Sequence, residues 1–129
     1  MAAIVWAAEH TPADARFLVN ATSWLSLQRG VDGGWWLLPL AGRWVSAPPV
    51  IYTYGAPDYV RAIGQLNKPV IGYQKGQPQP IYNLIARERI SYIYLSARAG
   101  PLTVETFAGN PLFEVVYRHE GVTILAVHR

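Results

Sequence analysis

The order of helix-like and strand-like segments constrains the fold of this chain most strongly. Apolar residues at helical spacing and short β-branched or aromatic runs follow one another along all 129 residues, without an internal repeat. The order is helix, strand, helix, strand, two helices, strand and a closing hairpin. Such alternation is typical of an α/β fold. We therefore predict one α/β domain over 1–129, a three-layer sandwich whose mixed central sheet has a parallel core and a C-terminal antiparallel hairpin.

The local patterns place these elements on the sequence. Helical patterns are predicted at 2–10, in a short apolar segment after Asp32 that Pro39 kinks or shortens, from Pro57 to a stop at 67–69, and at 81–89. Strands are predicted at 16–20, 43–46, 91–96, 113–117 and 122–127, the last two joined as a hairpin by 118–121. Loops are predicted at 21–30 and 72–80, whereas 50–54 fits an edge strand or a loop and 102–108 fits a short helix or a loop.

The composition narrows the class of protein. Hydrophobic residues make up 51% of the chain and charged residues 15%, well below the usual quarter. This balance indicates a compact domain with an apolar surface or an interface. The net charge is +3, and the cations are scattered along the chain, whereas nucleic-acid binders concentrate them in a patch. We therefore predict no nucleic-acid partner.

The chain has no cysteine, which excludes disulfides and thiolate metal sites. No apolar run reaches the roughly 18 residues of a membrane span, and the N-terminus lacks a signal-peptide pattern. We expect the isolated fragment to be soluble.

Known catalytic motifs are absent from the sequence. It contains no nucleophile elbow, no dinucleotide-binding glycine motif and no phosphate-binding loop. His10, His119 and His128 are too far apart for a local metal motif, so we expect structural or exposed roles for them. The carboxylates form no close pair in the sequence. We predict no catalytic residue, metal or cofactor in this chain, and its status as an enzyme stays open.

The stretch 31–44 is the strongest candidate for a binding function, because it holds three of the five tryptophans. One interpretation is that Asp32 binds sugar hydroxyls while an indole stacks on the sugar. The other is that Asp32 caps the helix while Trp35 and Trp36 fill the core or an interface. Arg43 pairs with Asp32, binds an anionic group or is simply exposed. With Trp24 from the preceding loop, these residues form the predicted acceptor or partner site.

A short pattern at Asn20-Ala21-Thr22 matches a glycosylation acceptor. Because three residues match often by chance, we interpret it as a chance match.

Three segments in order carry a resemblance to a known family: 6–19 with its His10-Thr11-Pro12, 32–43 with its Asp-Gly-Gly-Trp-Trp, and the hairpin 113–127. Together they resemble the soluble domain that follows the membrane region in bacterial GT-C-type glycosyltransferases. These enzymes are relatives of dolichyl-phosphate-mannose protein mannosyltransferases and, more distantly, of oligosaccharyltransferase catalytic subunits. The resemblance covers nearly the whole chain.

In that family the catalytic acids and the lipid-linked sugar donor lie in the membrane region. The resemblance thus implies a non-catalytic accessory domain on the periplasmic or extracellular side of a bacterial membrane. Its partners would be the membrane-embedded catalytic domain of the same polypeptide and a glycan or peptide acceptor. Oligosaccharyltransferases read their acceptor with a Trp-Trp-Asp motif, whereas here Asp32 precedes Trp35 and Trp36. The resemblance therefore implies only that the turn at Asp32 faces the active site.

Two other functions stay open from the sequence. The first is a stand-alone α/β interaction protein whose apolar surface forms a homodimer or partner interface. The second is a small-molecule-binding enzyme that uses the loop after Asn20.

Overall fold

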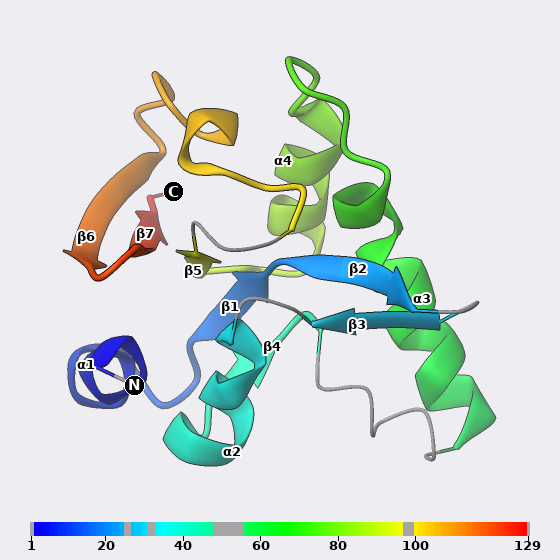
Figure 1. Ribbon diagram of the computed structural model, residues 1–129, viewed down its shortest axis with the longest axis horizontal. Helices are drawn as coiled ribbons and strands as arrows, with labels where there is room; N and C mark the ends of the chain where they lie inside the picture. The colour runs from blue at the N-terminus through cyan, green and yellow to red at the C-terminus, as the bar shows by residue number, and fades with distance from the viewer. Residues whose placement is uncertain (1, 25–26, 31–32, 48–55, 97–99, 129) are drawn as a thin grey trace.

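The computed structural model describes residues 2–24, 27–30, 33–47, 56–96 and 100–128 (Figure 1). Its centre is a five-stranded sheet in the order β4-β1-β5-β7-β6. The strands are β1 (Arg16–Val19), β4 (Trp44–Val45), β5 (Tyr92–Ser96), β6 (Phe113–His119) and β7 (Val122–Val127). β1 pairs in parallel with β4 and β5, while β7 pairs antiparallel with β5 and β6. The predicted parallel core and C-terminal hairpin are confirmed.

Helices lie on both sides of this sheet and complete the three layers (Figure 1). The helical elements are α1 (Ala2–His10), η1 (Gly34–Trp36), α2 (Leu37–Ala41), α3 (Pro57–Ile71), α4 (Gln79–Arg87) and η3 (Val104–Thr106). α1 and α2 contact each other on one side, and α4, which contacts α3, lies on the other. β1 is therefore covered on both faces, and its consecutive Phe17, Leu18 and Val19 are all fully buried.

The loop predicted at 21–30 is wrong, because this segment forms a second sheet. β2 (Ala21–Trp24) and β3 (Leu27–Gly30) pair as an antiparallel hairpin. An isolated two-stranded hairpin is marginal in water, and both of these strands pack against α3. Because this support comes from a helix more than 25 residues further along the chain, the local sequence pattern does not predict the hairpin.

The predicted end of the third helix at 67–69 is also wrong, since α3 continues through Pro69 to Ile71. Proline removes one intrahelical hydrogen bond, but the neighbouring contacts compensate. The Asn67 side chain is fully buried, and its Nδ2 donates to the carbonyls of Ser46 at 2.6 Å and Ile63 at 2.9 Å. Val70 is buried as well. Tertiary packing thus holds the last turn of α3.

The remaining elements are found where they are predicted, with different bounds: the helix predicted at 81–89 is Gln79–Arg87, so the loop predicted at 72–80 ends earlier. The helix with Pro39 is the short alternative, and the proline lies in the first turn of α2, where a missing N–H costs little. The α4 face with Ile81, Leu84 and Ile85 is buried as expected. The 102–108 segment contains the single turn η3, and 50–54 lies outside the described residues.

The connection between β6 and β7 is tighter than predicted. Only Glu120 and Gly121 link the strands, with φ of 51° and 80°. Positive φ at both central residues is the requirement of a type I′ hairpin turn.

Candidate functional site

The candidate site lies at the edge of the sheet where the parallel strands end. In open α/β sheets ligands bind at the carboxyl ends of the strands, where successive connections leave in opposite directions. β1 is such a strand here, because the chain leads from it to β4 on one side and later to β5 on the other. The β6–β7 turn lies at the same edge, since Val122 pairs with Ser96 at the end of β5.

Gly33 and Gly34 lead the chain across this edge. Gly33 has a φ of +86°, which favours glycine. A Cβ on Gly34 would lie 2.8 Å from Cγ1 of Val19 and 2.9 Å from Cδ1 of Tyr94. Each glycine therefore has its own structural explanation: Gly33 supplies a left-handed backbone, and Gly34 leaves room for the side chains of Val19 and Tyr94.

Asn20 ties the end of β1 to the segment that follows β5. Its side chain is fully buried, its Nδ2 donates to the carbonyl of Leu102 at 3.0 Å, and its Oδ1 accepts from the N–H of Leu102 at 2.8 Å. Gly100 packs so closely that a Cβ there would lie 2.3 Å from Cγ of Asn20. The nitrogen that glycosylation would modify is thus buried and bonded, which agrees with the interpretation of a chance match.

The predicted site residues do not all lie at this edge. Arg43 directly precedes β4, whose Trp44 pairs with Arg16 at the opposite, amino end of the parallel strands. Trp24 lies at the end of β2 that is farther from β1. Trp35 and Trp36 lie in η1. Asp32, on which the two interpretations depend, lies outside the described residues. Trp36 keeps 43% of its surface exposed, so it does not belong to the core.

The Arg43 side chain joins the ends of α1 and α2. Its guanidinium donates to Oγ1 and the carbonyl of Thr11 at 3.0 and 2.9 Å, to the carbonyl of Ala8 at 3.1 Å and to that of Ala41 at 2.6 Å. A cation that binds the last carbonyls of a helix also complements the helix dipole. Arg43 therefore holds two helices together, a role that sequence reasoning missed because its partners are mainly backbone carbonyls.

Four large exposed apolar side chains lie on α1, η1 and α2. They are Val5 at 50% exposure, Trp36 at 43%, Leu38 at 42% and Leu40 at 48%. We call these four residues the α1–α2 apolar surface. Apolar surface of this kind, when contiguous, marks a site of interaction with a protein or a membrane.

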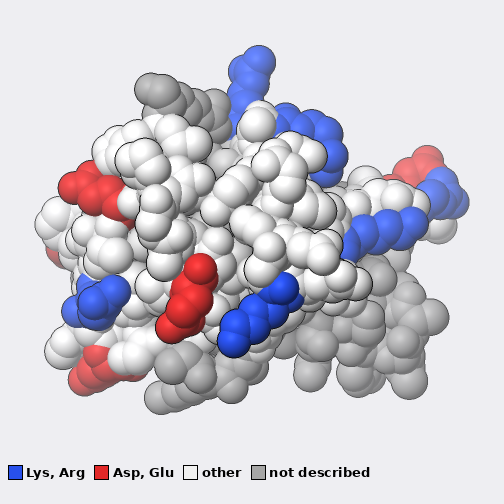
Figure 2. All heavy atoms as spheres, turned by 90° about the horizontal axis from the view of Figure 1, so that it is seen from above, with Lys and Arg blue, Asp and Glu red and all other residues white. Residues whose placement is uncertain are grey.

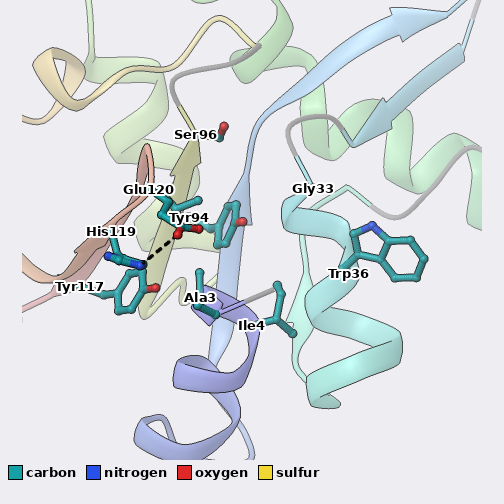
Figure 3. A pocket seen from close by; sticks show the side chains of 11 residues that line it. Ala3, Ile4, Gly33, Trp36, Tyr94, Ser96, Tyr117, His119 and Glu120 are labelled. Carbon is teal, nitrogen blue, oxygen red and sulfur yellow. Dashed lines mark ion pairs between the residues drawn. The ribbon is translucent and has the colours of Figure 1, made fainter.

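A pocket of about 240 Å³ borders this surface, between the first turn of α1, the end of β5 and the β6–β7 turn. Figure 3 shows the side chains of Tyr94, Tyr117, His119 and Glu120 directed toward one another, whereas the Trp36 indole points away. Nε2 of His119 lies 3.4 Å from Oε1 of Glu120. We call this hollow the carboxyl-edge pocket. Sequence reasoning missed it, because the strand order that brings the hairpin turn to β5 is not visible locally.

A β-bulge on β6 decides which side chains reach the carboxyl-edge pocket. The register with β7 shifts at Val116, which is the extra residue. In a regular strand Phe113 and Tyr117 would share a face. Instead Phe113 packs against Tyr82 of α4 with ring centroids 5.5 Å apart, and Tyr117 packs against Trp6 of α1 at 5.4 Å. The bulge thus turns Tyr117 toward the α1 side of the sheet.

A second hollow, of about 630 Å³, lies on the other face of the same edge, lined in part by Glu105 and Arg118. The pKa of Glu105 is lowered because its carboxylate accepts hydrogen bonds from its own backbone N–H and from the Thr103 side chain. The carboxylate is therefore ionised at neutral pH and does not serve as a proton donor.

On the face that Figure 2 shows, the charged side chains do not gather into one patch. Figure 2 shows lysine and arginine dispersed over the visible face, with acidic side chains between them. Among the described residues no group of three or more histidines and carboxylates is placed to hold a metal ion. No helix in this part of the chain is long and apolar enough to span a bilayer.

Comparison of the chain with protein-family models, with curated proteins and with solved structures finds no match. The described part of the site offers an apolar surface beside a small pocket with aromatic and polar walls, which is chemistry suited to binding.

Proposed function

We propose that this chain is a non-catalytic accessory domain of a membrane glycosyltransferase, on the periplasmic or extracellular side of a bacterial membrane. It packs against the membrane-embedded catalytic domain of the same polypeptide and helps to position the acceptor or to cover the active site. The observation that carries the proposal is the α1–α2 apolar surface beside the carboxyl-edge pocket. The sequence resemblance at 6–19, 32–43 and 113–127 supports it.

The position of the apolar surface fits this function. Four of the seven large apolar side chains that are exposed among the described residues lie on α1, η1 and α2. η1 and α2 follow the Asp-Gly-Gly turn, which the resemblance places toward the active site. A partner that covers these residues would therefore also sit beside the carboxyl-edge pocket.

The test is sugar transfer by the full-length polypeptide that carries the double substitution Leu38→Ser and Leu40→Ser. Both side chains are exposed, so we expect the thermal stability of the 129-residue chain to change little. Loss of two apolar contacts at an interface should lower transfer by about tenfold or more.

The matched control is Leu112→Ser with Val115→Ser, which removes apolar groups of similar exposure from the β6 region. We expect this variant to keep wild-type transfer. Equal transfer in both variants would contradict the proposed docking surface.

A stand-alone dimerisation or interaction domain is the second candidate, because the same apolar surface could bury itself against a second copy. Sedimentation of the 129-residue chain at micromolar concentration distinguishes the two. A dimer that the Leu38→Ser and Leu40→Ser variant abolishes would favour the second candidate, whereas a monomer favours the accessory domain.

A further inference from the structure

The walls of the carboxyl-edge pocket come from three neighbouring strands. β5 contributes Tyr94, β6 contributes Tyr117 and His119, and the turn to β7 contributes Glu120. Tyr94 is almost fully buried and forms the floor, while Tyr117 is half-buried and forms a wall (Figure 3). Aromatic rings in this arrangement offer apolar faces, and tyrosine adds a polar tip.

The polar groups of the pocket both donate and accept hydrogen bonds. The Glu120 carboxylate accepts hydrogen bonds and disfavours an anion such as phosphate. The His119 imidazole lies beside the carboxylate at 3.4 Å, and both side chains are more than half exposed at the rim. The first turn of α1, from Ala2 to Ile4, also lines the pocket. The ligand that suits this combination carries groups that both donate and accept hydrogen bonds.

Vicinal hydroxyl groups on a ring have these properties. Their O–H groups donate to a carboxylate, their oxygens accept from N–H groups, and the C–H face of a sugar ring packs on an aromatic side chain. The volume of about 240 Å³ lies just below the range of drug-sized pockets. A single sugar ring is the matching size, with the rest of a longer glycan outside.

We propose that the carboxyl-edge pocket binds one neutral sugar residue, with Glu120 accepting from its hydroxyls and Tyr117 packing on its apolar face. The role of the bound sugar rests on the proposed function, since the glycan would be the acceptor or product that the domain positions.

The backbone of β6 supports this proposal independently. β-bulges are concentrated beside functional sites, where they redirect a side chain. Here the bulge at Val116 places Tyr117 on the pocket side, while Phe113 stays on the opposite side. The type I′ turn then holds Glu120 at the rim with a left-handed backbone.

The experiment is an amide chemical-shift titration of the 129-residue chain with neutral methyl glycosides of glucose, galactose, mannose and N-acetylglucosamine. Inorganic phosphate and tetramethylammonium serve as the charged probes. We expect saturable shifts with at least one glycoside, at the amides of Ala3, Ile4 and 117–122, and none with the charged probes.

Glu120→Asn is the test variant, because asparagine suits a left-handed turn position and precedes Gly121 in the most favoured type I′ sequence. It removes the carboxylate while preserving the hairpin, and we expect about tenfold weaker glycoside binding. Arg118→Gln is the matched control, since Arg118 lines the hollow on the other face, and it should bind as the wild type does.

Three results would overturn the proposal: no saturable shift with any glycoside, shifts with phosphate or tetramethylammonium instead, or equal glycoside binding by Glu120→Asn and the wild type. The titration uses no membrane segment. Failure of glycoside binding is therefore distinguishable from failure of docking to a membrane domain, which the transfer assay of Leu38→Ser and Leu40→Ser measures.

Discussion

At the residue scale, glycines and one asparagine fix the edge of the sheet where the site lies. Gly33 provides a left-handed backbone, and Gly34 leaves room for Val19 and Tyr94. Asn20 closes the other side through its two hydrogen bonds to Leu102. The sequence presents the Asp-Gly-Gly stretch as a candidate binding turn, and the structure shows a backbone role for Gly33 and close packing at Gly34.

Gly34→Ala tests this packing. The added Cβ would lie under 3 Å from two packed side chains, so we expect a loss of about 1–3 kcal/mol in the free energy of unfolding. Gly76→Ala is the control. Its φ of +85° strains an alanine through the backbone alone, which is not the case at Gly34, and no atom lies within 4 Å of the added Cβ. Urea unfolding of both variants measures the difference, and a loss no larger for Gly34→Ala than for the control would contradict the close approach.

At the element scale, the sequence predicts the elements that carry their own pattern and misses those that depend on distant partners. β1 is predicted from three consecutive apolar residues, which the structure buries, and α4 from its amphipathic spacing. The β2–β3 hairpin depends on α3, and the end of α3 depends on contacts of Asn67. The carboxyl-edge pocket is likewise invisible locally, because a bulge decides which way Tyr117 points.

The contact between α1 and α2 offers a prediction at this scale. Arg43→Ala removes hydrogen bonds to Ala8, Thr11 and Ala41, so we expect a loss of about 2–3 kcal/mol in the free energy of unfolding. Arg43→Lys keeps the positive charge but not the planar set of donors, so we expect it to recover part of the lost stability. Thermal unfolding checks both variants. Wild-type stability of Arg43→Ala would show that the guanidinium does not join the helices.

At the scale of the whole molecule, three features lie together: the ends of the parallel strands, the α1–α2 apolar surface and the carboxyl-edge pocket. The proposed accessory domain would account for all of them, because one side would contact a membrane-embedded partner while the adjoining pocket would meet the acceptor. The identity of that partner comes from the sequence resemblance alone.

The attachment to a membrane glycosyltransferase is tested by the hydropathy of the reading frame upstream of Met1. We predict several consecutive apolar segments of about 20 residues each, the last of them ending shortly before Ala2. A start codon at Met1 with no membrane segment before it would contradict the attachment and leave a free-standing α/β domain.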